Sequence, residues 1–197
     1  MATASTDKVN LEAKSPYEMR VHLGDDVPEV DVRSALKTGD MGFLHSYTTG
    51  SAVDGPGIRV VAWTTACMFR CQYCHNPDTW TLSNGIPVTL ERAIDGVRKY
   101  AHGLKLMHGG FTLSGGEPLM QDRFAVRLLS AVKAMGVHTA METNGFFNER
   151  LSDEELKVID LGHIVAEMNA HLVRAFGLQV DLFGRGGGHF ILRGTYG

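Results

Sequence analysis

The sequence predicts an α/β fold with a parallel sheet, because short apolar strands alternate with amphipathic helices along most of the chain. Strands are expected in IRVVAWTT from Ile58, in FTLS and in VHTAM, where β-branched and apolar residues run together. Helices are expected after Thr89 and from about Asp122, where apolar residues recur at helical spacing. Strands joined in this way place the loops after their carboxyl ends at one edge of the sheet, which is where we expect the site.

Each expected helix has a start signal or a stop signal in the sequence. Thr89 suits the N-cap of the first, and the second should run from about Asp122 to a stop at Gly136. Ser152, with Glu155 three residues later, predicts a capping box at the start of a third. The faces expected to be buried hold Leu90, Ala93, Ile94 and Val97 in the first helix, and Phe124, Leu128, Leu129 and Val132 in the second.

The composition indicates one globular domain. The chain has 197 residues, is 44% hydrophobic and carries a formal net charge of -3, so charge suggests neither a nucleic acid nor a membrane as partner. No apolar run is long enough to span a bilayer and the start lacks a secretory pattern, so we expect a cytoplasmic protein with reduced thiols. We expect a flexible N-terminal extension over residues 1–41, a core over 42–161 and an atypical tail over 162–197.

All three cysteines of the chain, Cys67, Cys71 and Cys74, fall in the stretch CMFRCQYC, directly after the first expected strand. Thiolates are ligands for zinc or iron–sulfur clusters. Structural zinc needs four ligands, and His75 is poorly placed to be the fourth because it adjoins a cysteine. Three cysteines on a four-iron cluster would leave one iron open to another ligand. The alternative to a metal site is that these are ordinary buried cysteines, but their polar neighbours make a core position unfavourable.

The spacing CxxxCxxC after a strand, with an aromatic residue before the last cysteine, resembles the radical S-adenosylmethionine (SAM) enzymes. More narrowly, VDGPGIRVVAWTTACMFRCQYCHNPDTW, TLSGGEPLMQ and METNGF resemble pyruvate formate-lyase activating enzymes, over about half the chain from Gly42 to Gly145. The resemblance implies a partial parallel (β/α) barrel of the radical SAM type, which would be incomplete at the C-terminus here.

The resemblance also implies roles for individual residues. Cys67, Cys71 and Cys74 would bind a [4Fe-4S] cluster and so serve catalysis, with Tyr73 and His75 beside the adenosine of SAM. Read without the resemblance, Tyr73 could be a core ring and His75 a loop residue that caps a carbonyl.

The other motifs would complete the SAM site. Gly115 and Gly116 would admit SAM close to the backbone, and the Glu117 carboxylate would pair with its amino group, although GGEP alone is also a good turn. Glu142 and Asn144, with Thr143 between them, would face the same ligand from the end of the third strand; the family usually has aspartate at the position of Glu142. Asp54, Gly55, Pro56 and Gly57 would contact the protein substrate, or simply form a turn.

The implied activity is the transfer of one electron from reduced flavodoxin or ferredoxin to SAM, which splits into methionine and a 5′-deoxyadenosyl radical. That radical would take hydrogen from a glycine of pyruvate formate-lyase. Other glycyl radical enzymes, such as anaerobic ribonucleotide reductase or a diol dehydratase, are alternative targets. A non-catalytic iron–sulfur binding fragment is the alternative from a different class.

The pattern departs from the family after Leu161. A lysine is expected at the end of the fourth strand, but the sequence reads GHIVAEMNAH, and the glycine-rich GRGGGHFILRGTYG is an unusual end for a barrel. We therefore expect a truncated or frame-shifted product.

Overall fold

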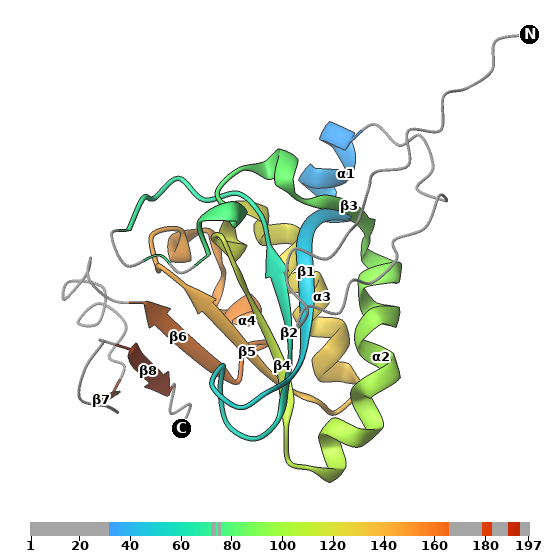
Figure 1. Ribbon diagram of the computed structural model, residues 1–197, viewed down its shortest axis with the longest axis vertical. Coiled ribbons are helices and arrows are strands. Elements are labelled where there is room, and N and C mark those ends of the chain that lie inside the picture. Colours follow the sequence, from blue (N-terminus) through green and yellow to red (C-terminus); the bar gives the residue numbers. More distant parts are fainter. Residues whose placement is uncertain (1–31, 72–73, 75, 166–178, 183–188, 194–197) are drawn as a thin grey trace, which may run out of the picture.

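The computed structural model describes residues 32–71, 74, 76–165, 179–182 and 189–193. Its strands form one eight-stranded sheet in the order β3-β1-β2-β4-β5-β6-β8-β7 (Figure 1). The strands β2, β4, β5 and β6 pair in parallel at its centre, and antiparallel strands flank them on both sides. The bounds are β1 Met41–Ser51, β2 Arg59–Thr64, β3 Ile86–Thr89, β4 Gly110–Gly115, β5 His138–Thr143, β6 Leu161–Val165, β7 Gln179–Leu182 and β8 His189–Arg193.

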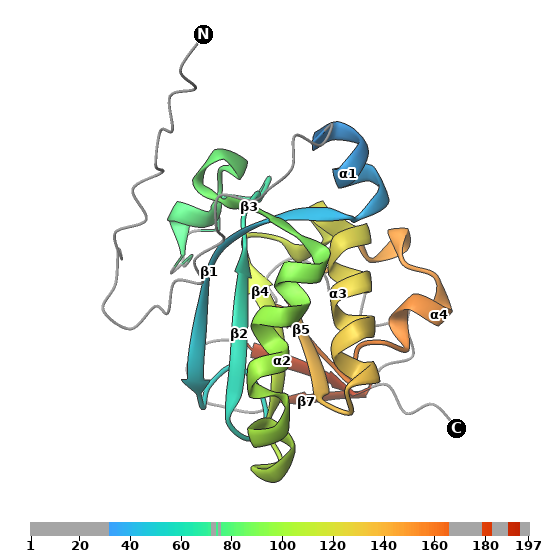
Figure 2. The same cartoon turned by 90° about the vertical axis from the view of Figure 1, so that its right-hand side faces the viewer.

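Two long helices cover one face of this sheet side by side (Figure 2). They are α2 (Leu90–Leu106), which follows β3 in the connection from β2 to β4, and α3 (Asp122–Ala134), which lies between the parallel strands β4 and β5. The core lies between them and the sheet, with Phe111 of β4 and Phe124, Leu128 and Leu129 of α3 almost wholly buried. The remaining helices are short: α1 Val32–Thr38, α4 Asp153–Leu156, and the 3-10 turns η1 Pro77–Thr79, η2 Leu82–Asn84, η3 Pro118–Gln121 and η4 Asn148–Arg150.

The predicted α/β architecture is confirmed, including the start signals of its helices. The Thr89 hydroxyl accepts a hydrogen bond from Arg92 N at 3.3 Å, and Ser152 forms the expected capping box with Glu155. Helix α1 and the strands β1, β3, β7 and β8 were not predicted; β1 mixes polar and apolar residues, and β3 is only four residues long.

The structure also describes regular elements in both flanking segments of the predicted domain division. Helix α1 and the first residue of β1 fall within residues 1–41, and β7, β8 and most of β6 fall within residues 162–197. No helix among the described residues is long and apolar enough to cross a membrane.

The carboxylate of Asp160 ties α3 to the start of β5. It accepts hydrogen bonds from Thr139 N at 2.9 Å and from Lys133 Nζ at 2.6 Å. Burial acts to raise the pKa of Asp160, but the hydrogen bonds from Lys133 and Thr139 outweigh it and hold that pKa below the ordinary 3.8. The ionised carboxylate therefore stabilises the folded chain.

Replacing Asp160 with asparagine (D160N) is expected to lower the free energy of unfolding by about 1–2 kcal/mol at neutral pH, because the amide loses one charged hydrogen bond. Since the folded pKa is lowered, the contribution is complete above the ordinary aspartate pKa and is lost as the pH falls through the folded value. Urea unfolding of both proteins over this pH range measures it. Asp95→Asn, on an exposed residue of α2 paired with Arg98, is the matched control and should change little. Equal stability of D160N and the parent at pH 7 would contradict the expectation.

Candidate functional site

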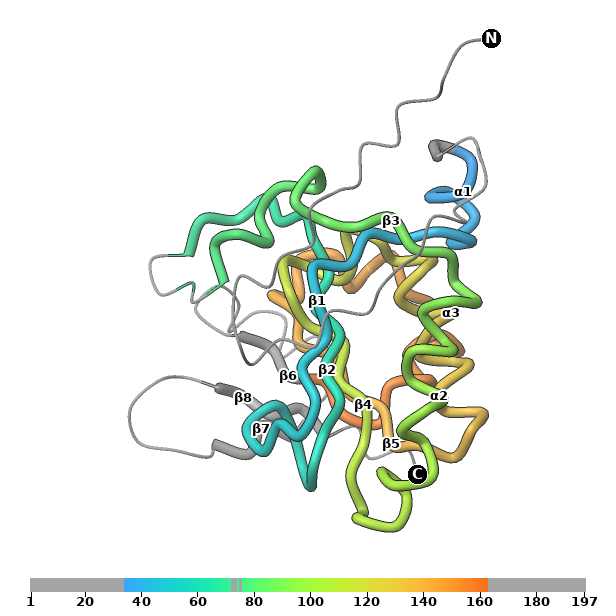
Figure 3. Tube along the Cα trace, turned by 45° about the vertical axis from the view of Figure 1, so that its right-hand side comes forward, coloured from blue at the N-terminus to red at the C-terminus, as the bar shows by residue number. Residues whose placement is uncertain are grey.

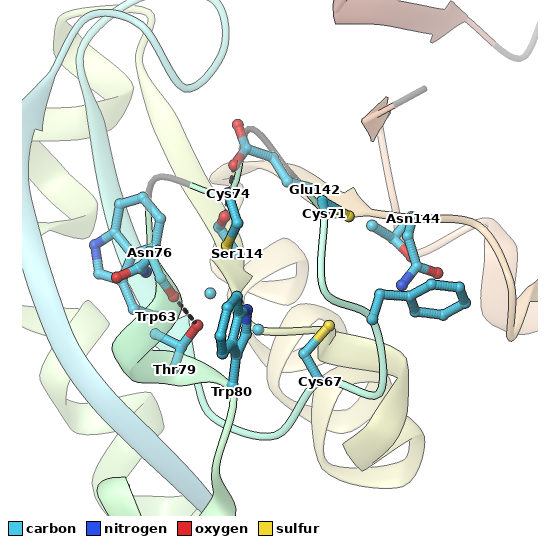
Figure 4. Close-up of a pocket in the computed structure, with 14 residues that line it drawn as sticks. Trp63, Cys67, Cys71, Cys74, Asn76, Thr79, Trp80, Ser114, Glu142 and Asn144 are labelled. Carbon is cyan, nitrogen blue, oxygen red and sulfur yellow. Dashed lines mark hydrogen bonds between the residues drawn. The ribbon is translucent and has the colours of Figure 1, made fainter. Parts of the chain in front are cut away.

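A cavity lies at the carboxyl ends of β2, β4 and β5, where the sequence placed the site (Figure 4). It is walled by the cysteine loop after β2, the glycine turn after β4 and the turn after β5. Both tryptophans of the chain also line it. The lining residues are Trp63, Cys67, Phe69, Cys71, Cys74, Asn76, Thr79, Trp80, Ser114, Gly115, Gly116, Glu142, Thr143 and Asn144.

The cysteine loop is fixed at its base by backbone hydrogen bonds to the end of η1 and the residue after it. Cys67 N donates to Trp80 O at 3.0 Å, and Ala66 N donates to Thr79 O at 2.9 Å. Ala66 has a φ of 77°, a left-handed conformation that costs energy in a residue other than glycine. The Arg70 guanidinium donates to Cys67 O at 2.8 Å and lies 4.5 Å from the centre of the Trp80 ring. These contacts hold the start of the loop against Thr79 and Trp80.

The three cysteines are free and half-buried, and all line this one cavity. Burial raises the pKa of the Cys67 thiol, and the nearby Glu117, Cys71 and Cys74 act in the same direction. No group of three His, Cys, Asp or Glu side chains close enough to hold a metal occurs in the part of the chain that is described. The donor set fits an iron–sulfur cluster in its chemistry and its shared cavity, and the thiols must deprotonate and converge to bind one.

The glycine turn packs against the protein's own backbone. A Cβ on Gly116 would lie 2.4 Å from Ala66 O, and one on Gly115 would lie 2.2 Å from Thr64 N and O. Gly115 also has a φ of 118°. The glycines are thus needed first for the contact between β4 and the end of β2, a different reason from the ligand approach that the sequence suggested. Both nevertheless line the cavity.

Glu142 and Glu117, the two carboxylates expected at the site, have different positions. Glu142 lines the cavity and accepts a hydrogen bond from the Ser114 hydroxyl at 2.5 Å. Glu117 is fully buried, and it is not among the described residues that line the cavity. Its carboxylate accepts hydrogen bonds from Leu119, Thr143 and Asn144. The sequence prediction that this carboxylate meets the SAM amino group is therefore not matched by its placement.

The other predicted site residues lie elsewhere or outside the described residues. Residues 54–57 form the turn between β1 and β2, at the opposite end of β2 from the cysteine loop (Figure 3). The structure does not bring this turn into the cavity, and its contact with a protein substrate stays a prediction. Tyr73 and His75 lie outside the described residues.

Sequence reasoning missed several cavity residues that local signals could have indicated. Trp63 and Ser114 are the second-last residues of β2 and β4, and Asn76, Thr79 and Trp80 belong to the quoted HNPDTW segment. Phe69 lies inside the cysteine spacing itself and meets Phe146 edge to face, with ring centroids 5.3 Å apart. The available signal was that each of these residues lies near, in the sequence, to the end of a strand or to a cysteine expected to bind the cluster.

Comparison with known proteins agrees with this geometry. The family described as "4Fe-4S single cluster domain" matches residues 53–173. The pyruvate formate-lyase-activating enzyme of Clostridium pasteurianum is 38% identical over 128 residues, which cover 63% of this chain and 54% of that protein. The pyruvate formate-lyase 1-activating enzyme of Escherichia coli (strain K12) is 38% identical over 140 residues, covering 68% and 57%. For the pyruvate formate-lyase-activating enzyme of Listeria monocytogenes the values are 42% over 105 residues, covering 53% and 42%.

The chain spans about half the length of these curated relatives. The family match covers more than half of this chain, from the turn before β2 to beyond β6, and includes every described residue that lines the cavity. The chain therefore belongs to the 4Fe-4S single cluster domain family.

Proposed function

We propose that this chain is a radical SAM activating enzyme that generates a glycyl radical on pyruvate formate-lyase. The observation that carries the proposal is the shared cavity of Cys67, Cys71 and Cys74 at the carboxyl ends of three parallel strands. The similarity to pyruvate formate-lyase-activating enzymes supports the choice of target over other glycyl radical enzymes.

A [4Fe-4S] cluster on the three cysteines would supply the single electron that splits SAM into methionine and a 5′-deoxyadenosyl radical. Reduced flavodoxin or ferredoxin is the proposed source of that electron. The radical takes a hydrogen atom from the glycine Cα, which leaves 5′-deoxyadenosine and the glycyl radical.

The residues around the cavity have proposed roles in binding and orienting SAM. Trp63 and Trp80 offer aromatic faces beside the cysteine loop, and aromatic faces stack on flat ligands such as adenine. Glu142 places a carboxylate in the wall, where it can accept hydrogen bonds from an ammonium group. Tyr73 and His75 remain proposed adenosine contacts by resemblance alone.

Anaerobic reconstitution with iron and sulfide, followed by reduction with dithionite in the presence of SAM, tests the proposal. The expected product is 5′-deoxyadenosine, with a glycyl radical signal in electron paramagnetic resonance when pyruvate formate-lyase is added. A protein that forms the cluster but yields no 5′-deoxyadenosine would instead be the non-catalytic iron–sulfur fragment. A colourless protein that carries zinc after anaerobic purification would contradict both readings.

A further inference from the structure

Glu117 is the residue at which three parts of the cavity wall meet. Its backbone N–H donates to Ala66 O at 2.8 Å, directly before the cysteine loop. It follows the glycine turn in the chain, and its side chain reaches the turn after β5, where Thr143 and Asn144 line the cavity. Glu117 therefore contacts all three walls, the cysteine loop through its backbone and the end of β5 through its side chain.

The carboxylate of Glu117 is satisfied by the protein itself. Oε1 accepts from Leu119 N at 2.9 Å and from the Thr143 hydroxyl at 2.7 Å, and Oε2 accepts from Asn144 N at 2.8 Å. Its side chain has no exposed surface. Burial raises the pKa of Glu117, which these three donors oppose. A carboxylate surrounded by donors in this way needs no ammonium partner.

The ends of β4 and β5 depend on side chains for their connection. The parallel pairing of the two strands reaches Leu113 and Met141 and stops there. Beyond that pair, the Ser114 hydroxyl bonds to Glu142, and Glu117 bonds to the turn that follows β5. The cavity wall between β4 and β5 is therefore built from side-chain hydrogen bonds where the backbone ladder ends.

We propose that Glu117 is a positioning residue, which holds the turn at residues 143–145 against the glycine turn and so sets the shape of the cavity wall that Thr143 and Asn144 present to SAM. The carboxylate itself does not touch SAM. The identity of the ligand rests on the proposed function. The hold of the Glu117 carboxylate on the turn at residues 143–145, which we call the tether, rests on the geometry alone.

Glu117→Gln tests the tether with almost no change of shape. Each carboxylate oxygen accepts from one backbone N–H, of Leu119 on Oε1 and of Asn144 on Oε2. A glutamine amide has one oxygen, so either orientation turns its NH₂ group toward one of these two N–H groups. Glu154→Gln is the matched control, because Glu154 is exposed and bonds to Lys157 within its own helical turn.

Amide hydrogen exchange of the chain without SAM is the first measurement. In Glu117→Gln, the amide of Leu119 or Asn144 should exchange roughly tenfold faster or more, because it loses a charged acceptor. The control should exchange as the parent does at both positions. Parent-like exchange in Glu117→Gln would overturn the tether, whatever the chain binds.

Affinity for SAM and for an analogue that lacks its amino group is the second measurement, on the reconstituted protein. Glu117→Gln should weaken binding of both ligands by the same factor, roughly tenfold, with cluster content unchanged. A loss confined to SAM would mean that the carboxylate meets the ammonium, and unchanged affinity for both would mean that the tether does not shape the site. Either result overturns the proposal. If the parent binds neither ligand, the proposed function fails, while the exchange measurement still decides the tether.

Discussion

Replacing any one of Cys67, Cys71 and Cys74 with alanine is expected to reduce the iron–sulfur cluster content by about tenfold or more. The three thiols line one cavity and are the complete set of cysteines in the chain, so no spare thiol can substitute for a lost ligand. Iron and sulfide content after anaerobic reconstitution, with the visible absorption of the cluster, measures the loss.

Met68→Ala is the control for this experiment. Met68 lies in the same loop, is 60% exposed and does not line the cavity, so its removal should leave the cluster content unchanged. If one cysteine variant keeps the full cluster, that cysteine is not a ligand. If all three keep it, the assignment of the cluster to this loop is wrong.

Replacing Arg59 with methionine is expected to lower the free energy of unfolding by about 3–5 kcal/mol. The Arg59 guanidinium has no exposed surface and donates to the Thr112 hydroxyl at 2.5 Å, to Phe111 O at 2.6 Å and to Pro56 O at 3.0 Å. Burial lowers the pKa of Arg59 to about 10, so the group is still charged at neutral pH. Methionine fills the space of the stem but donates to none of these acceptors.

Urea unfolding at neutral pH measures this effect, with Arg98→Met as the matched control. The Arg98 side chain is 61% exposed and bonds to Asp95 on the same helix, so its replacement should cost less than about 1 kcal/mol. Equal losses in the two variants would show that the buried hydrogen bonds of Arg59 contribute nothing beyond those of a surface pair.

The parts of the fold that could be predicted are those whose signals are local. Thr89 and Ser152 cap helices through bonds to residues three positions later, and this spacing is visible in the sequence. The three motifs of the site each follow one of three parallel strands, and the carboxyl ends of parallel strands meet at one edge of the sheet, so their shared location could also be predicted. Strand β1 was missed because its antiparallel pairing with β2, from Leu44 to Ser51, is a tertiary choice for a segment of mixed polarity.

The direction of a side chain could not be predicted in the same way. The GGEP motif places a carboxylate after β4, but the donors that hold Glu117 include Thr143 and Asn144, which are brought to it by the packing of β5. Similarly, Gly116 looks suited to a ligand until the position of Ala66 O shows what a side chain would strike. Contacts between segments decide such details, and a single sequence does not contain them.

Every described residue that lines the cavity lies between Trp63 and Asn144, and the parallel strands in that interval pair in the order in which they occur along the chain. During synthesis, when a chain leaves the ribosome from its N-terminus, the complete set of these walls is made before residue 145 is added. The pairing of β2 with β4 joins segments that are far apart in the sequence, such as Val60 and Phe111, and parallel pairing of this kind is slow to form. The described lining of the pocket that we assign to the cluster and to SAM is thus encoded in one continuous stretch of the chain, ahead of the strands β7 and β8 at the far edge of the sheet.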